Sequence, residues 1–492
     1  MPLLNNDSPP DRVVILLENL RSVGNGIEIS SVRRARMFHD VMGVTPWIVT
    51  SNFNPALQDH VVELKRKGNM PSGVLVRNVY EWLAEMGRAG VVIPLSNAQS
   101  AQESPGVRLV QLKRGRAAGL AKSVYVDAAD KGQIWREDFA LDGCDPLLQK
   151  DYVPQHPKQK LQRIFMRYAN GVVQEFKSES EWVCHIVGMN MAADLTWHFQ
   201  IDKNKMFRWL TRTPAIQRLR KTMTAVIHSA HLLPNGEYKS SYKHLVQDAG
   251  SADRLITLTQ EQRADLISLG VSADRLSVIP NVFSALPAQP SDVQRVLKRA
   301  IFLARYAPEK QHELLIRVFQ QVLARVPDAE LCTYGAGPMK ESLERQVRSL
   351  GLERSIKING YVEDIASVYR AAGIGVIPSR EEGFSNFGLE CLSYGCPLVS
   401  FSAKYGPRDL LEHQHAGLLI APDDEAAMAL ALIDLFEHPK KIESMRPGAL
   451  RSASRYTPEV VTGLWREWLA DMRALALHQA RDSSTAVNCV QL

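Results

Sequence analysis

The sequence lacks both a cysteine framework and a long hydrophobic run. Six cysteines occur in 492 residues, and none forms a C-x2-C pair. Cys391 and Cys396 have four residues between them and no histidine nearby, which favours packed free thiols over a metal site. The best apolar run, Ala426–Phe436, is interrupted by Asp434 and is typical of a core helix. Residues Met1–Arg12 are polar where a signal peptide needs an apolar core, so these absences together predict a reducing, cytoplasmic location.

The chain also lacks a large excess of charge of either sign. Its 59 Lys and Arg against 53 Asp and Glu give a net charge of +6, which does not indicate a nucleic-acid-binding protein. A small basic excess suits an anionic substrate or an anionic membrane face equally well. The composition, 45% hydrophobic and 23% charged, is that of a soluble globular protein, and the length allows two or three domains.

The most informative stretch of the sequence is Ser379–Arg408. It follows a short apolar run, Ile374–Ile377, which predicts a buried parallel strand. A loop rich in Gly, Ser and Asn comes next, and a helical pattern starts at about Leu389. A strand, a glycine loop and a helix N-terminus together form an anion site, because free N–H groups and the helix dipole meet there. Glu382 and Glu390 bracket this site, although each is also an ordinary residue for a loop or a helix start.

The first half of the chain opens with a mononucleotide-binding pattern. A strand at Arg12–Leu17 is followed by Gly24-Asn25-Gly26, a helix and a second strand at Trp47–Thr50. The glycine pair is weak evidence alone, since a tight turn that needs a positive φ explains it too. Asn54–Lys67 and Val74–Met86 both show helical patterns.

Between Val107 and Val187 the pattern changes to short β-rich runs. Runs at Ser123–Val126, Ile134–Leu141 and Ile164–Tyr168 are each followed by turn residues, the last by Asn-Gly. These hairpin signals predict an antiparallel meander inserted in the first α/β domain. The alternative is a passive surface insertion, which proteins tolerate well.

The α/β pattern resumes near Leu195 and places three charged or titratable residues at strand ends. His228 follows the strand Ala225–Ile227, and a lone histidine there is more often structural. Arg305 ends the strand Arg299–Arg305, and Lys310 lies five residues further on. A forked guanidinium and a compact ammonium at one strand-to-helix corner suit two phosphates, although two solvated surface cations are the alternative.

A family resemblance joins these features. The pattern Glu-Gly-Phe-(x)5-Glu from Glu382 to Glu390 resembles the E-x7-E motif of retaining GT-B glycosyltransferases of family 4. Tyr405-Gly406-Pro407 narrows the match to the branch of poly(glycerol-phosphate) and poly(ribitol-phosphate) α-glycosyltransferases of teichoic acid synthesis. The resemblance extends from Val13 to about Ala474. It implies an α/β architecture of GT-B type, with two Rossmann-like domains facing a cleft and an antiparallel β-sheet insertion in the N-terminal domain.

The expected domain boundaries follow from these patterns. They are an N-terminal Rossmann-like domain in two parts (1–105 and 191–287), a β-rich insertion (106–190), a C-terminal nucleotide-sugar-binding domain (288–456), a crossover helix (457–475) and a mobile tail (476–492).

The resemblance also implies roles for individual residues. Arg305 and Lys310 would bind the donor diphosphate, Glu390 the ribose, and Glu382 and His228 the donor sugar. The implied catalytic set is therefore His228, Arg305, Lys310 and Glu382. The implied donor-binding residues are Gly24, Gly26, Gly335, Gly337, Tyr361, Ser385, Asn386, Phe387, Gly388, Leu389 and Glu390, where the N–H groups of Ser385 to Leu389 would hold the diphosphate.

The activity that the resemblance implies is transfer of glucose or N-acetylglucosamine from UDP-glucose or UDP-N-acetylglucosamine, with retention of configuration and with no metal or other cofactor. The expected acceptor is a hydroxyl of a polyol-phosphate (teichoic-acid-like) polymer, a lipid-linked glycan or another cell-envelope glycan. A homo-oligomer formed through the insertion and peripheral contact with the inner membrane face are expected, and no nucleic-acid partner. Two alternatives remain open: a non-catalytic GT-B partner subunit, and a sugar-nucleotide epimerase, which would lack the insertion.

Overall fold

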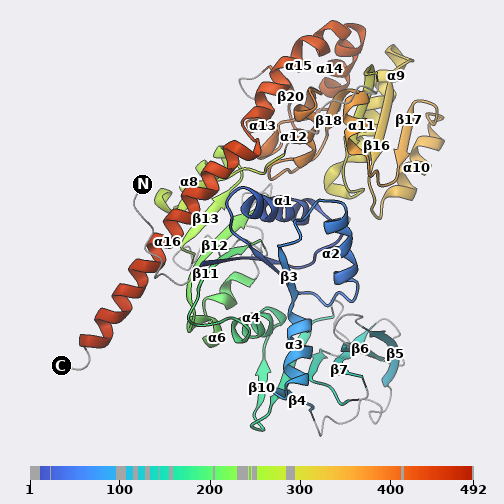
Figure 1. Ribbon diagram of the computed structural model, residues 1–492. Coiled ribbons are helices and arrows are strands. Elements are labelled where there is room, and N and C mark those ends of the chain that lie inside the picture. The colour runs from blue at the N-terminus through green and yellow to red at the C-terminus, as the bar shows by residue number, and fades with distance from the viewer. Residues whose placement is uncertain are drawn as a thin grey trace. The chain divides into compact units, whose positions relative to one another are not determined.

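The computed structural model divides the chain into two compact units (Figure 1). Unit 1 comprises Met1–Ala225, Gln247–Asp253 and Ala470–Leu492, and unit 2 comprises Val226–Val246 and Arg254–Leu469. The residues that the structure describes are 11–22, 24–95, 107–114, 120–127, 133–142, 144–153, 159–202, 206–229, 242, 245, 252–283, 294–411 and 415–489. The sequence predicts a boundary near residue 287, and that boundary stays a prediction.

Unit 1 is built on a parallel sheet in the order β3-β2-β1-β11-β12. Its strands are β1 (Asp11–Leu17), β2 (Trp47–Thr50), β3 (Leu75–Asn78), β11 (Thr196–Ile201) and β12 (Arg220–Ile227). The chain winds outward from β1 in one direction and then from β11 in the other. This order reverses between β1 and β11, which is the arrangement of a doubly wound nucleotide-binding sheet. The prediction of a mononucleotide-type opening is confirmed.

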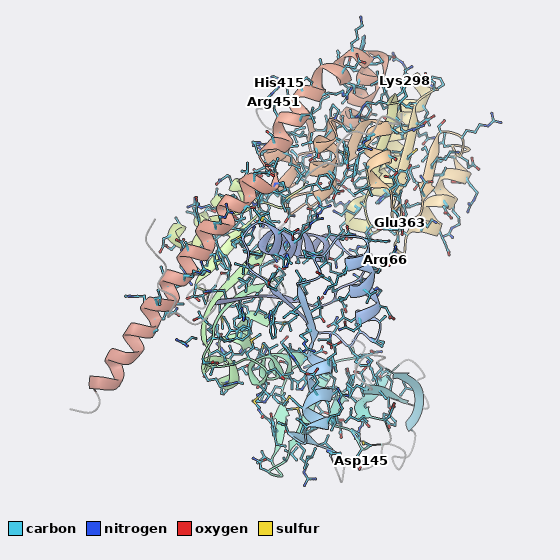
Figure 2. The ribbon with its side chains drawn as sticks, viewed as in Figure 1. Arg66, Asp145, Lys298, Glu363, His415 and Arg451 are labelled. Atoms are coloured by element: carbon cyan, nitrogen blue, oxygen red, sulfur yellow. The ribbon has the colours of Figure 1, made fainter. Side chains whose placement is uncertain are left out.

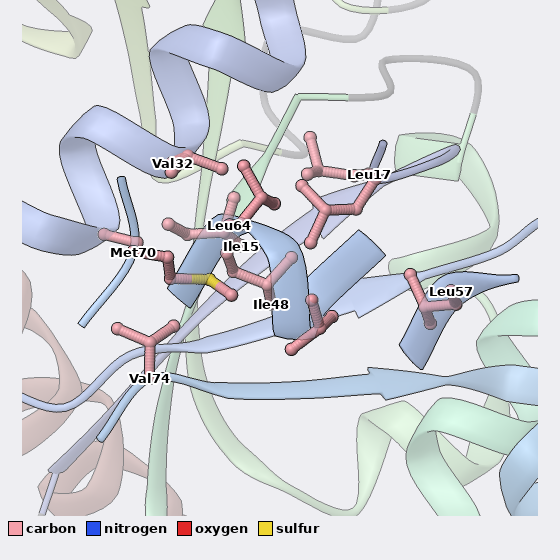
Figure 3. Close-up of a cluster of buried hydrophobic side chains, with 11 residues drawn as sticks. Ile15, Leu17, Val32, Ile48, Leu57, Leu64, Met70 and Val74 are labelled. Carbon is pink, nitrogen blue, oxygen red and sulfur yellow. The ribbon is translucent and has the colours of Figure 1, made fainter. Parts of the chain in front are cut away.

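Apolar side chains from the sheet and two helices form the core on one side of β1 and β2. Helix α1 (Gly26–Asp40) contributes Val32, and α2 (Leu57–Arg66) contributes Leu64. These side chains meet Ile15 and Ile48 of the sheet, as Figure 3 shows. The polar face of α2 carries Arg66, which is labelled in Figure 2. Arg66 pairs with Glu63 at 2.8 Å. The helix thus has the one-sided apolar pattern that its sequence predicts.

One expected helix is wrong in part. The structure has β3 up to Asn78 and then α3 (Val79–Arg88), where the sequence pattern predicts a helix over Val74–Met86. Asn78 ends the strand and caps the helix: its side chain accepts from the Tyr80 N–H at 2.9 Å, while Glu81 accepts from the Asn78 N–H at 3.1 Å. This reciprocal capping box is a start signal in the sequence, and it marks the correct boundary.

The predicted antiparallel meander is confirmed as a separate sheet in the order β10-β9-β8-β7-β6-β5, with β4 paired to β9. Its strands are β4 (Val92–Ile93), β5 (Val107–Arg114), β6 (Leu120–Asp127), β7 (Ile134–Leu141), β8 (Leu148–Tyr152), β9 (Leu161–Tyr168) and β10 (Val173–Phe176). The expected turns at 130–132 and at 143 lie outside the described residues. At the third turn Gly171 takes a positive φ of 83°, as an Asn-Gly hairpin requires.

A buried lysine ties this sheet to the helices beside it. Lys150 of β8 is 3% exposed, and its Nζ lies 2.6 Å from the Tyr80 hydroxyl and 2.7 Å from Oε1 of Glu179. Tyr80 belongs to α3 and Glu179 to α4 (Glu179–Met189). The same Nζ lies 5.1 Å from the centre of the Phe139 ring. Ion pair and cation–π contacts together compensate for the burial of this charge.

Unit 2 contains a six-stranded parallel sheet in the order β17-β16-β15-β18-β19-β20. Its strands are β15 (Val296–Leu303), β16 (Glu330–Tyr334), β17 (Ile356–Asn359), β18 (Ala372–Ile377), β19 (Leu398–Phe401) and β20 (Gly417–Ile420). Its helices are α9 (His312–Arg325), α10 (Lys340–Ser349), α11 (Ile365–Ala371), α12 (Asn386–Ser393), α13 (Gly406–Leu411), α14 (Glu425–Glu437) and α15 (Pro439–Ser454). The unit also holds the parallel pair β13 (Arg254–Thr257) and β14 (Leu276–Val278) with α8 (Gln260–Ser268).

The last helix is longer than the sequence predicts. The sequence predicts a crossover helix over 457–475, but α16 runs from Pro458 to Cys489. The segment after residue 475, expected as a tail, therefore continues the helix, because small and polar residues of adequate helix propensity follow without a glycine or proline. None of the helices in the described ranges combines the length and the apolar character that a membrane span needs.

We predict that two neighbouring valines of α2 differ sharply in their contribution to stability. Val61 is 6% exposed and packs in the core, whereas Val62 is 64% exposed. Val61→Ala should lower the free energy of unfolding by roughly 2 kcal/mol, because buried methyl groups are lost. Val62→Ala should change it by less than about 0.5 kcal/mol. Urea denaturation followed by circular dichroism measures both, and equal effects would contradict the packing described for α2.

Candidate active site

The strand order of unit 2 reverses between β15 and β18, and the predicted site residues follow these two strands. Neighbouring parallel strands end at the same edge of a sheet, and a reversal leaves a crevice there for a ligand. The loop after β15 carries Arg305 and Lys310, and the loop after β18 carries Glu382. The fold therefore brings Lys310 and Glu382, which are 72 residues apart in the sequence, to the same edge of the sheet.

Lys310 and Glu382 form the closest contact of this cluster. The Lys310 Nζ lies 2.6 Å from Oε1 of Glu382, and the two side chains are 23% and 10% exposed. Lys310 ends a short 3-10 turn, Pro308–Lys310, and Gln311 then takes a positive φ of 49° before α9 begins. This turn directs the lysine back across the end of the sheet. A partly buried cation and carboxylate are thus held together at the switch point.

Arg305 lies at the same corner but has a different partner. Its side chain is 63% exposed and pairs with Glu309, four residues further on. The guanidinium is therefore available at the surface of the corner, while Lys310 contacts Glu382. The structure confirms the Arg305 and Lys310 positions at one strand-to-helix corner and gives them different environments.

The glycine turn after β16 packs against the backbone of this corner. A Cβ at Gly335 would lie 2.1 Å from the Ala304 carbonyl oxygen, and one at Gly337 would lie 2.4 Å from that of Tyr306. The Tyr306 N–H donates to the Ala336 carbonyl at 3.0 Å. Both glycines are thus required for close approach of two loops. Tyr361, which follows β17, is 54% exposed.

The Glu382 loop is fixed by the segment that contains Tyr405-Gly406-Pro407. The Glu382 N–H donates to the Lys404 carbonyl at 3.0 Å, and the Tyr405 N–H donates to the Glu382 carbonyl. A Cβ at Gly406 would lie 1.8 Å from the Phe384 carbonyl oxygen, so only glycine fits there. The Tyr-Gly-Pro pattern therefore has a structural role, which is to hold the backbone on both sides of Glu382.

Asp265 of α8 is a supporting residue that the sequence does not reveal. Its Oδ2 accepts from the Lys404 Nζ at 2.6 Å and from the Tyr405 hydroxyl at 3.1 Å. Burial, together with the negative charge of Asp265, raises the pKa of Tyr405 well above its usual value, so the phenol stays a donor. Asp265 thus anchors the segment that holds Glu382. Only the fold brings it there, since 140 residues separate it from Tyr405.

His228 is brought next to the Glu382 loop by its backbone. A Cβ at Gly383 would lie 2.0 Å from the His228 carbonyl oxygen, so the two segments are in direct contact at a glycine. The next residue, Ser229, accepts at its carbonyl from Nε2 of Gln262 at 3.0 Å. The expectation that His228 belongs to this site agrees with that contact.

The helix after the Glu382 loop starts earlier than the sequence predicts. Helix α12 begins at Asn386, not near Leu389, because Ser385 takes a positive φ of 73° and caps it. The Ser385 Oγ accepts from the Gly388 N–H at 3.2 Å, and the Ser385 carbonyl accepts from the Leu389 N–H at 3.1 Å. The N–H groups of Gly388 and Leu389, both assigned to the diphosphate above, are therefore used inside the helix.

This capping leaves a smaller anion site than the five N–H groups of Ser385 to Leu389. The first N–H groups of an α-helix point out of its N-terminus, and Asn386 and Phe387 are the first two residues of α12. The side chains of Phe387 and Leu389 are buried at 7% and 0% exposure, so these residues face the core. The Phe387 ring packs edge-on against Phe302, with centroids 5.3 Å apart. The Asn386 Oδ1 accepts from Nδ2 of Asn281 at 2.9 Å.

Glu390 lies in the second turn of α12 and has a tyrosine partner. The Tyr369 hydroxyl donates to its Oε2 at 2.6 Å. The side chain of Tyr369 is fully buried, whereas Glu390 is partly exposed. The sequence motif predicts Glu390 but gives no signal for Tyr369, which lies on the preceding helix, α11.

The predicted Gly24 and Gly26 lie in unit 1, after β1. Neither backbone takes a positive φ, so the turn explanation for this pair is wrong. Asn25 instead caps α1 by accepting from the N–H groups of Ile27 and Glu28 at 2.9 and 3.1 Å. A Cβ at Gly24 would lie 2.8 Å from that of Glu28, which explains the need for glycine there. A contact of this loop with the donor stays a prediction.

A buried histidine beside Lys310 is a further residue that the sequence did not predict. His312 is 1% exposed, and its ring lies between those of Phe302 and Tyr306, with centroids 4.8 and 4.9 Å away. Burial first, and then the positive charge of Lys310, lowers its pKa to about 4. His312 is therefore neutral at physiological pH, as a packing residue between two aromatic rings should be.

Comparison with known proteins identifies part of the chain. The family model described as "Glycosyl transferases group 1" matches residues 298–438, which span the sheet of unit 2 and the cluster at its edge. Residues 298–438 form a glycosyltransferase group 1 domain.

Curated relatives match slightly less than half of the chain. An exopolysaccharide phosphotransferase of Streptomyces coelicolor is 28% identical over 231 residues, which are 46% of this chain and 24% of the relative. The poly(glycerol-phosphate) alpha-glucosyltransferase of Bacillus subtilis is 24% identical over 236 residues, which are 47% of this chain and 35% of the relative. The glycosyltransferase match thus spans between a quarter and about a third of the length of these two relatives.

A solved structure shares the fold over almost the whole chain. TarM of Staphylococcus aureus, as a mutant in complex with fondaparinux, alpha-GlcNAc-glycerol and UDP, superposes with a TM-score of 0.75. The superposition covers 93% of this chain and 99% of that one, at 17% identity. The predicted GT-B fold is therefore confirmed.

We predict that His312 makes stability depend on pH. Its pKa is about 4 in the folded chain against an ordinary value of 6.5, so the unfolded chain binds the proton more readily. The free energy of unfolding should keep its full value above pH 6.5. It should fall by roughly 3 kcal/mol as the pH is lowered to 4, because the unfolded chain then binds a proton that the folded chain does not. His312→Phe, which keeps an aromatic ring and cannot titrate, should reduce this slope.

Urea midpoints measured between pH 4 and 7 test the slope. The matched control is His438→Gln, because His438 is an exposed histidine with its side chain 59% accessible. The same pH slope in wild type and His312→Phe would contradict the account of this residue.

Proposed function

We propose that this chain is a retaining glycosyltransferase that moves glucose or N-acetylglucosamine from a UDP-sugar to a hydroxyl of a cell-envelope polymer. One observation supports this most strongly: the Lys310–Glu382 pair, 2.6 Å apart, lies at the switch point of the group 1 glycosyltransferase domain. The N-terminus of α12 follows directly and favours an anion at the same edge. The site therefore offers positive charge and N–H groups for a diphosphate next to a carboxylate for a sugar.

In the proposed reaction the diphosphate is the leaving group. Lys310 and Arg305 neutralise the negative charge that develops on it, and the Asn386 and Phe387 N–H groups add hydrogen bonds. The bond between the anomeric carbon and the phosphate oxygen breaks, and UDP leaves with its electron pair. The acceptor oxygen attacks the anomeric carbon from the same face, so configuration is retained. The acceptor proton passes to the departing phosphate. Charge neutralisation is thus assigned to two side chains, and no metal is required.

The remaining site residues orient the donor. Glu382 contacts hydroxyl groups of the transferred sugar. When the diphosphate binds, Lys310 contacts the phosphate oxygens, and its ion pair with Glu382 is weakened. The His228 carbonyl, which contacts Gly383, lies where its dipole can stabilise positive charge on the sugar ring. Glu390 accepts hydrogen bonds from the ribose. Gly335, Gly337 and the exposed ring of Tyr361 bound the nucleotide side of the site.

The proposed acceptor is a polyol-phosphate polymer or a related envelope glycan. The names of two relatives refer to polymers, one to an exopolysaccharide and the other to poly(glycerol-phosphate). The net charge of +6 favours an acceptor of this kind. We further propose a cytoplasmic enzyme that contacts the inner face of the membrane and assembles into a homo-oligomer through the β insertion.

Two other functions fit the fold less well. A non-catalytic partner subunit would have no need for the complete set of Lys310, Glu382, Glu390 and His228, which this chain keeps. A sugar-nucleotide epimerase would turn over the donor without an acceptor, and it has no use for the inserted sheet. Acceptor-dependent turnover separates all three.

We predict that UDP release from one UDP-sugar is stimulated by synthetic glycerol-phosphate or ribitol-phosphate oligomers. Glu382→Ala should lower this turnover about 100-fold or more, because a contact to the reacting sugar is lost while the fold remains. Glu437→Ala is the matched control, since Glu437 is a surface residue at the end of α14 that pairs with Arg325.

The assay offers a panel of UDP- and GDP-sugars to the purified chain and measures released nucleoside diphosphate with and without each oligomer. Conversion of a UDP-sugar into its epimer without net release of UDP, detected by analysis of the remaining sugar nucleotide, would favour the epimerase. A folded chain that releases nothing from any donor would overturn the proposed transferase.

A further inference from the structure

Tyr369 is a buried phenol that contacts a residue of the proposed donor site. It lies in α11, and its hydroxyl donates to Oε2 of Glu390 at 2.6 Å. We propose that Tyr369 is the positioning residue that sets the orientation of the Glu390 carboxylate and thereby the selectivity of the site for a ribose over a deoxyribose. This inference rests on the proposed function, which assigns Glu390 to the ribose.

The ring of Tyr369 is held rigidly. It is fully buried and stacks on Tyr394, with the ring centroids 5.4 Å apart and the planes 9° from parallel. The Phe387 ring lies on another side at 6.1 Å. Two aromatic neighbours and complete burial leave the phenol one orientation, because a well-packed interior allows few rotamers. The position of the hydroxyl is therefore determined by the core, not by the ligand.

A single arginine, Arg295, connects helices α11 and α12, which carry Tyr369 and Glu390. Arg295 donates through Nη2 to the Tyr394 carbonyl at 2.9 Å, at the end of α12. It donates through Nη1 to the Ala372 carbonyl and, at 3.5 Å, to the Tyr369 carbonyl, at the end of α11. A cation at two helix C-termini satisfies carbonyl groups that have no intrahelical donor. The helices bearing Tyr369 and Glu390 are thus joined at their ends as well as through the hydroxyl.

This arrangement has a chemical consequence at the site. A glutamate on a helix has three side-chain torsions, so a solvated carboxylate samples many orientations. A hydrogen bond from a rigid phenol to one oxygen restricts that freedom. The carboxylate is then pre-arranged to accept from the hydroxyl groups of a ribose. A nucleotide that lacks these hydroxyls gains nothing from the pre-arrangement, which is how Tyr369 acts on selectivity without touching the ligand.

Calorimetric titration with UDP and with 2′,3′-dideoxy-UDP tests the proposal. The wild-type chain should bind UDP about tenfold or more tightly than the dideoxy nucleotide, because the dideoxy nucleotide has no ribose hydroxyl groups to donate to the Glu390 carboxylate. Tyr369→Phe keeps the stacked ring and removes only the hydroxyl. It should weaken UDP binding about tenfold and change binding of the dideoxy nucleotide less than about twofold.

Tyr394→Phe is the matched control, because it alters the other ring of the same stack and leaves the Tyr369–Glu390 hydrogen bond in place. It should keep the preference for UDP. If Tyr369 has a purely structural role, Tyr369→Phe should weaken the binding of both nucleotides equally, and that result would overturn the proposal. Unchanged UDP binding in Tyr369→Phe would overturn it too.

The wild-type titrations separate this inference from the proposed function. If the wild-type chain does not bind UDP, the proposed donor and this inference both fail. If it binds UDP and the dideoxy nucleotide equally, donor binding stands and the positioning role of Tyr369 is overturned.

Discussion

The ion pair between Lys310 and Glu382 is the interaction on which the account of this chain depends. It exists because β15 and β18 are neighbours in the sheet although some 70 residues separate the loops that follow them. A parallel sheet that reverses its winding direction leaves these two loop ends at one edge with no helix between them. A cation and a carboxylate that meet there are partly withdrawn from water, so each charge has a stronger effect on a bound ligand than it would have on an open surface.

The rest of unit 2 serves to hold that pair in place. Close approaches at Gly335 and Gly383 bring loops from other strands against the backbone of the site, and a side chain at either position would force them apart. Asp265 anchors Lys404 and Tyr405, whose backbone groups in turn hold Glu382. The geometry of one carboxylate is therefore set by contacts that reach as far as α8. Such a supporting network is what a site needs to keep its reacting groups within a fraction of an ångström.

The sequence predicts the parts of this arrangement that depend on local patterns. Short apolar runs located β1, β2 and β18, and the spacing of Glu382 and Glu390 identified the motif. Where local signals compete, the predicted boundaries are wrong. The apolar residues before Asn78 have a helical pattern but form a strand, and the serine and glycine residues after Glu382 have the composition of a loop although some of them belong to α12. In both places a capping side chain, Asn78 or Ser385, decides the boundary.

Supporting residues could not be predicted, for a physical reason. Asp265, Tyr369 and His312 have no unusual neighbours in the sequence, and each acquires its role only from a partner that the fold brings to it. Tyr369 and Glu390 lie on different helices, 21 residues apart. A motif records the residues that touch a ligand, whereas the residues that orient them are visible only in three dimensions. The same limit applies to Gly24, whose need for glycine comes from the close approach of Glu28.

A crystal structure of the chain grown with UDP tests the central claim most directly. The account predicts the diphosphate at the edge between β15 and β18, with its oxygens within hydrogen-bond distance of the Lys310 Nζ and the N–H groups at the start of α12, and the ribose on Glu390. UDP bound elsewhere, or bound there with the Lys310–Glu382 pair undisturbed and no contact to either residue, would contradict it.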